Sequence, residues 1–103
     1  MEGQIYTANE IREKLQPVFH SSQVEKAILF GSFAKGNQTA LSDADIFIDS
    51  KGKLQGIDFF GILGDITDIL KIPVDLIEAC EVIEGGKIEQ EIFDTGVVIY
   101  ERI

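Results

Sequence analysis

The chain has 103 residues, of which 45% are hydrophobic and 26% are charged, and its formal net charge is −9 at pH 7. This length and composition predict a single globular domain over residues 1–103 with one modest core. The acidity argues against direct binding of nucleic acid through its phosphates, which requires clustered lysine and arginine.

Nothing in the sequence indicates a membrane or a secreted protein. No stretch approaches the ~18 consecutive apolar residues of a membrane-spanning helix. The start, Met1–Gln4, lacks the basic residues of a signal peptide. The single cysteine, Cys80, excludes an internal disulfide and is expected to fill space at the end of a strand. We therefore expect a cytoplasmic protein.

The first predicted element is a helix. Thr7 and Glu10 have the spacing of a capping box. Apolar residues at helical spacing extend the helix to about His20. Pro17 falls inside this pattern and is expected to bend the helix or to end it early.

Two strands follow this helix. Val24–Phe30 is predicted as the first strand and Asp43–Asp49 as the second. Between them, Gly31–Gly36 is predicted to form a tight turn with about one turn of helix. The connection is short, which favours antiparallel pairing of the two strands.

The second half of the chain continues the alternation of helices and strands. A helix is predicted from Ile57 to about Leu70, then a strand over Val74–Ile77, a short helix over Ile83–Phe93 and a last strand over Val97–Tyr100. The helix between the second and third strands is typical of a parallel crossover. The fold class is therefore α/β, with a small mixed sheet flanked by helices.

Two aspartates, Asp43 and Asp45, lie at the start of the second predicted strand. Side chains alternate along a strand, so both are expected on one face, ~7 Å apart. Two carboxylates this close repel each other unless a cation or a proton lies between them. The pair therefore predicts a bound divalent metal ion.

A glycine and a serine, Gly31 and Ser32, precede the aspartates and are typical of a turn that offers backbone N–H groups to a phosphate. Gly31 and Gly36 have the outer spacing of a P-loop. However, Asn37 and Gln38 stand where that motif requires lysine and serine or threonine, so a Walker-type NTPase is rejected. A metal ion beside a phosphate site predicts nucleotide chemistry.

A third aspartate, Asp75, lies in the next predicted strand, in Val74-Asp75-Leu76. Together with Gly31-Ser32 and the Asp43-x-Asp45 pair, it makes the chain resemble the DNA polymerase β-like nucleotidyltransferase superfamily. Within it, the chain is similar to the MNT-type minimal nucleotidyltransferases, which are antitoxins of HEPN-domain toxins. The resemblance covers essentially the whole chain and implies the polymerase β-like nucleotidyltransferase fold.

The resemblance also implies roles for individual residues. Gly31 and Ser32 would bind the phosphates of ATP. Lys35 would be a further nucleotide-binding residue; relatives commonly have arginine there, so lysine keeps the charge but loses bidentate geometry. Two Mg²⁺ ions would be held by three catalytic carboxylates: Asp43, Asp45 and Asp75. Asp75 could also act as general base.

The function implied by the resemblance is Mg²⁺-dependent transfer of AMP from ATP to a hydroxyl, expected to be that of a tyrosine, on a partner HEPN toxin. This chain would be the antitoxin and would act on that toxin, and either a homo-oligomer or a hetero-oligomer is open. One alternative is a non-catalytic antitoxin that neutralises its partner by contact. Another is a nucleotidyltransferase with a small-molecule acceptor, for which a homodimer would have to supply the wall that an additional helical domain provides in relatives.

Other acidic residues are expected to be structural or solvated. Asp49 would lie ~13 Å from Asp43 along an ideal strand, and we interpret it as a strand-end residue. Four acidic residues of the predicted helices are expected on solvated faces: Asp65, Asp68, Glu89 and Glu91.

Overall fold

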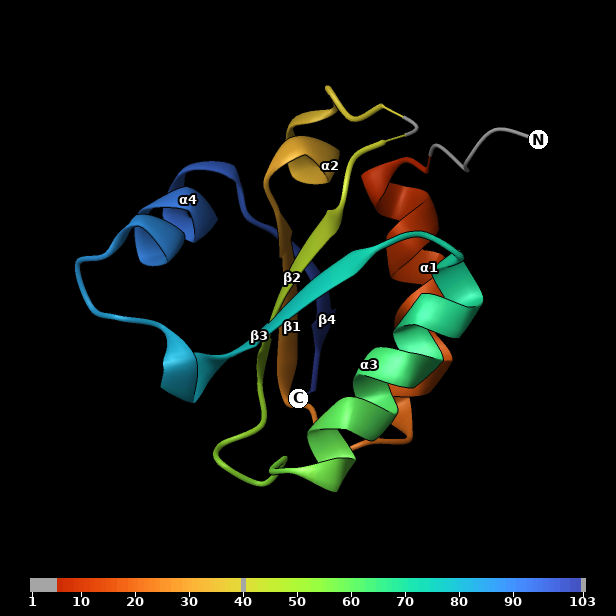
Figure 1. The fold of residues 1–103 in the computed structure, drawn as a ribbon, viewed down its shortest axis with the longest axis vertical. Coiled ribbons are helices and arrows are strands. Elements are labelled where there is room, and N and C mark those ends of the chain that lie inside the picture. The colour runs from red at the N-terminus through yellow and green to blue at the C-terminus, as the bar shows by residue number, and fades with distance from the viewer. Residues whose placement is uncertain (1–5, 40, 103) are drawn as a thin grey trace.

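The computed structural model describes residues 6–39 and 41–102, so the N-terminal segment Met1–Gln4 lies outside the described residues. A four-stranded sheet with the order β3-β2-β1-β4 forms the centre of the molecule (Figure 1). Its strands are β1 (Lys26–Phe30), β2 (Ala44–Asp49), β3 (Val74–Glu78) and β4 (Val97–Glu101).

Both predicted strand pairings are confirmed. β1 is antiparallel to β2, and β2 is parallel to β3. The last strand, β4, pairs antiparallel with the other side of β1, with a register shift between Ala27 and Ile28. The sheet is therefore mixed, as the alternation of elements predicts.

The first helix, α1 (Ala8–His20), begins with the predicted capping box. Thr7 Oγ1 accepts a hydrogen bond from Glu10 N–H at 3.1 Å, and Glu10 Oε1 accepts one from Thr7 N–H at 2.9 Å. The expectation of an early end at Pro17 is wrong, because the helix continues to His20. A proline in the last turn removes a single hydrogen bond, and burial of Phe19 holds that turn against the core.

One face of the sheet carries the core. α1 and α3 (Ile57–Leu70) cover this face, side by side (Figure 1). In β2, alternate residues are buried against these helices. The core contains residues of both helices and of the strands, among them Ile11, Leu15, Phe19, Leu29, Ala44, Ile46, Ile48, Ile62, Ile66, Leu70 and Ile99.

The opposite face of the sheet is covered only in part. α4 (Lys87–Thr95) lies on that side (Figure 1), and none of its residues is buried. The helix begins at Lys87 rather than at the predicted Ile83. The reason is a turn in which Gly85 has a φ of 79°, outside the helical range. A short 3-10 segment, η1 (Ala79–Glu81), precedes this turn, and it leaves Cys80 exposed rather than filling space as expected.

A buried carboxylate fixes the far ends of β2 and β3. Glu78 is only 3% exposed. It accepts hydrogen bonds from Ser50 N–H at 2.9 Å, from the Ser50 hydroxyl at 2.5 Å and from Cys80 N–H at 3.0 Å. Burial alone would raise the pKa of Glu78, but these hydrogen bonds outweigh it and hold the pKa below its ordinary value.

None of the helices in the ranges 6–39 and 41–102 is long and apolar enough to cross a membrane.

Candidate active site

The predicted site residues come together at one end of the sheet. β1 ends at Phe30 at the same end where β2 and β3 begin, because β2 is antiparallel to β1 and parallel to β3. Asp45 is in register with Phe30 on one side and with Asp75 on the other. Neighbouring strands lie ~4.8 Å apart, so Asp45 and Asp75 are immediate neighbours.

The pleat of β2 points these aspartates away from the core. Ala44 and Ile46 are buried, so Asp45 between them projects from the opposite face, where it is half-buried. Asp43 lies two residues before Asp45, just outside the strand, and is exposed; Asp75 is exposed as well. The carboxylates therefore face the partly open side of the sheet.

The carboxylates crowd one another. The pKa of Asp45 is raised from an ordinary 3.8 to about 6. Burial of the side chain is the largest cause, and repulsion from three neighbouring carboxylates adds to it: Asp75, Glu91 and Asp43. Within residues 6–39 and 41–102, none of the ion pairs involves these four side chains. A cation at this position would relieve the repulsion.

Glu91 is a neighbour of Asp45 that the sequence does not indicate. It is exposed on α4, where it was expected on a solvated face, yet it acts on Asp45 more strongly than Asp43 does. Its sequence gives no signal that separates it from Glu89, since both are acidic residues of one short helix. Only the position of α4 beside the open face of the sheet distinguishes them.

The turn after β1 lies directly against Asp45. Gly31 adopts φ 77° and ψ −149°, a region of backbone space used almost only by glycine. A Cβ atom added to Gly31 would overlap Asp45 Oδ2. The Gly31 N–H, expected to be free for a phosphate, instead donates to Thr95 Oγ1 at 3.0 Å.

The short helix α2 (Ser32–Lys35) follows this turn, as the sequence predicts. It begins without a side-chain cap. The first N–H groups of a helix have no acceptor within the helix, so they can bind an anion. Ser32 is half-buried at this start, and Lys35 is exposed at the last position of α2.

The described residues contain no group of three or more histidine, cysteine, aspartate or glutamate side chains arranged to hold a metal ion. The three aspartates therefore do not form a complete cage by themselves.

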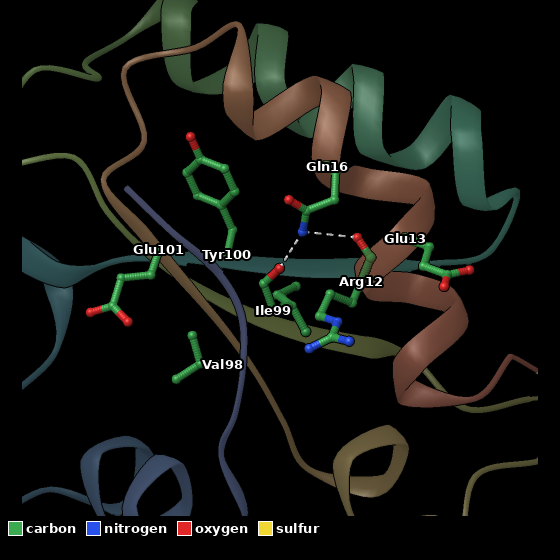
Figure 2. Close-up of a pocket in the computed structure, with 7 residues that line it drawn as sticks. All are labelled: Arg12, Glu13, Gln16, Val98, Ile99, Tyr100 and Glu101. Atoms are coloured by element: carbon green, nitrogen blue, oxygen red, sulfur yellow. Dashed lines mark hydrogen bonds between the residues drawn. The ribbon is translucent and has the colours of Figure 1, made fainter. Parts of the chain in front are cut away.

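A separate pocket lies between α1 and the outer edge of β4 (Figure 2). There, Gln16 Nε2 donates to the carbonyl oxygens of Ile99 at 2.6 Å and of Arg12 at 3.2 Å. None of the predicted site residues lines this pocket, and we assign it no part in the chemistry.

Gly31→Ala is expected to disturb both the turn and the carboxylate. The new methyl group would push the Asp45 side chain aside, and alanine is strained at a φ of 77°. We expect a loss of about 1–2 kcal/mol in the free energy of unfolding, together with loss of any activity that needs Asp45.

Gly56→Ala is the matched control for Gly31→Ala. Its φ is 56° and its ψ is −121°, also a region that disfavours alanine, but nothing lies within 4 Å of the added Cβ atom. Thermal unfolding and activity assays on both variants separate the strain from the contact. Equal activity of the two variants would contradict a role for the contact between Gly31 and Asp45.

Comparison with known proteins identifies the family. The sequence model of the family described as "Polymerase beta, Nucleotidyltransferase" matches residues 13–103. The chain belongs to this nucleotidyltransferase family. The nucleotidyltransferase is also 33% identical over 81 residues to a Methanocaldococcus jannaschii protein named "putative protein adenylyltransferase", across 75% of this chain and 94% of the relative. The predicted family and enzyme class are thus confirmed.

Solved structures share the fold of this nucleotidyltransferase. A chain of a toxin–antitoxin complex with AMP-PNP matches it with a TM-score of 0.75 at 21% identity, over 87% of this chain and 73% of that chain. A second match is a chain from a complex of a tri-AMPylated Shewanella oneidensis HEPN toxin with an MNT antitoxin. Its TM-score is 0.67 at 17% identity, over 88% of this chain and 70% of that chain. The polymerase β-like fold is confirmed.

Proposed function

We propose that this nucleotidyltransferase transfers AMP from ATP to a hydroxyl group of a partner protein. The partner is a HEPN-type toxin, the acceptor is one of its tyrosines, and the transfer makes this chain an antitoxin. The observation that carries the proposal is the meeting of Asp45 and Asp75 in register, with Gly31 against Asp45. The name of the adenylyltransferase relative and the AMPylated toxin in one structural neighbour support a protein acceptor.

Mg²⁺ fits the site by the charge and type of its donors. Carboxylate oxygens are hard ligands, and burial followed by repulsion from the neighbouring carboxylates raises the pKa of Asp45. We assign the ligands of the proposed two ions to the three aspartates: Asp43, Asp45 and Asp75. When bound, Mg²⁺ neutralises the triphosphate and stabilises charge on the entering and leaving oxygens, which matters in a chain whose net charge is −9.

In the proposed reaction, the acceptor hydroxyl oxygen forms a bond to the α-phosphorus of ATP. The bond between that phosphorus and the bridging oxygen breaks, and pyrophosphate leaves. Asp75, exposed at the open end of the sheet, accepts the hydroxyl proton. Ser32 and the N–H groups at the start of α2 bind the outgoing phosphates, and Lys35 adds a positive charge beside them.

The direct test is transfer of radioactive label. The protein is incubated with Mg²⁺, ATP labelled at the α-phosphorus and a purified HEPN-type partner, and the partner is then analysed for label. We expect labelled partner with the wild type, none after chelation of the metal, and none when the acceptor tyrosine is changed to phenylalanine. Absence of label under conditions in which a homologous pair reacts would contradict the proposal.

The second candidate function is neutralisation of the toxin by binding alone, without AMP transfer. Ile83 and Phe93, beside and within α4, are 76% and 86% exposed, and such side chains suit a protein interface. Growth of cells that express the toxin separates the two functions. Protection that survives the double substitution Asp43→Asn with Asp45→Asn would show that binding is sufficient.

A further inference from the structure

One side chain joins α4 to the turn after β1. Thr95 Oγ1 accepts the hydrogen bond from Gly31 N–H at 3.0 Å, and the same hydroxyl donates to the Glu91 carbonyl at 2.8 Å. A hydroxyl has a single proton. Because that proton is used within α4, the oxygen lone pairs of Thr95 are oriented to accept from Gly31.

The Gly31 residue is thereby held on both sides. Its N–H donates to Thr95, and its carbonyl oxygen accepts a hydrogen bond from Lys35 N–H at 3.0 Å. This second hydrogen bond is the first of α2. The same residue lies against Asp45. A rotation of the Gly31 backbone would therefore change its contact with the Asp45 carboxylate.

The contact is not a by-product of tight core packing. None of the residues of α4 is buried, and the helix rests on the open face of the sheet through half-buried side chains such as Ile92. Thr95 is itself half-buried in the last turn of this helix. Its hydroxyl thus connects a peripheral helix with the turn that carries the predicted phosphate site.

We propose that Thr95 is a positioning residue for the nucleotide. By holding the Gly31 peptide, its hydroxyl fixes the turn that lies against Asp45, a proposed ligand of the metal that binds the nucleotide. This inference rests on the proposed nucleotidyl transfer and adds a residue from α4 to it. Thr95 contacts neither ATP nor metal and acts only through Gly31.

The test is the equilibrium affinity for AMP-PNP in the presence of Mg²⁺, measured by calorimetry on the full chain at a temperature where every variant is folded. Thr95→Val keeps the shape of the side chain but loses the hydroxyl, and we expect affinity to fall about tenfold, equivalent to ~1.4 kcal/mol. Thr95→Ser keeps the hydroxyl and should restore affinity to within about threefold of wild type. In the transfer assay, KM for ATP should rise with Thr95→Val while kcat changes little.

Thr67→Val is the matched control. Thr67 Oγ1 donates to the Leu63 carbonyl at 2.8 Å, the same bond within a helix that Thr95 makes to Glu91. Thr67→Val should leave the affinity unchanged. Wild-type affinity in Thr95→Val, or equal weakening in Thr95→Val and Thr95→Ser, would overturn the inference and leave the proposed reaction standing. A wild type that does not bind the nucleotide would overturn both.

Discussion

Asp45→Asn is expected to abolish AMP transfer and to stabilise the metal-free protein. The substitution removes a carboxylate from the proposed metal site, for which we expect a loss of about a thousandfold or more in rate. It also removes a charge that is half-buried among other carboxylates. After allowance for solvent screening, the gain in the free energy of unfolding at pH 7 should be about 1–2 kcal/mol, or roughly 5–10 °C in Tm.

The stabilisation should depend on pH with a definite sign. The folded pKa of Asp45 is about 6, above its ordinary value of 3.8. The folded state therefore binds more protons in this interval, so the stability that the protonated form provides is present below pH 4 and is lost as pH rises through 6. The difference in Tm between Asp45→Asn and wild type should grow over this interval and shrink when Mg²⁺ and nucleotide are added.

Asp68→Asn is the control, because it removes one negative charge from an exposed position on α3. Calorimetric scans of the three proteins between pH 4 and 8 measure the effect. If Asp45→Asn were no more stable than Asp68→Asn at pH 7, the result would contradict a destabilising effect of the carboxylates crowded around Asp45.

Glu78→Ala is expected to have the largest effect on folding. The substitution leaves the N–H groups of Ser50 and Cys80 without their buried acceptor and opens a cavity. We expect a loss of about 3–5 kcal/mol in the free energy of unfolding, a large part of the total of a small domain. Chemical denaturation with urea measures it.

The part of the stability that comes from the charge of Glu78 should be lost in acid. Its folded pKa lies below the ordinary value of 4.5. The stability it provides is therefore present above that ordinary value and is lost as pH falls through the folded pKa. Glu84→Gln, at an exposed glutamate after η1, is the control. A cost for Glu78→Ala that matches this control, or that is independent of pH, would contradict a charged, hydrogen-bonded Glu78.

The elements of the fold were predictable where the local pattern is strong. The apolar spacing from Ile57 to Leu70 marks α3, and Thr7 with Glu10 marks the start of α1. The start of α4 was misplaced because Ile83 continues the apolar pattern into a segment that the Gly85 turn excludes from the helix. A periodic pattern shows which residues face the core but does not show where the backbone leaves the helix.

For the candidate site, the sequence indicated residues in short motifs but not the contacts that distant segments make with them. Asp43, Asp45 and Gly31 lie close in sequence, and Asp75 was suggested by its place in the next predicted strand together with the family resemblance. The hydrogen bond of Gly31 with Thr95 spans 64 positions, and the effect of Glu91 depends on how α4 rests on the sheet. Such contacts arise from tertiary packing, which a single sequence does not encode in any local pattern.

The coverage of the sheet also bears on how this enzyme could diversify. α1 and α3 pack on one face, whereas the carboxylates and α4 share the other. Effects of substitutions that are distant and share no partners add independently. Changes at exposed residues of α4 that do not contact the site, such as Phe93, should therefore carry little penalty in folding.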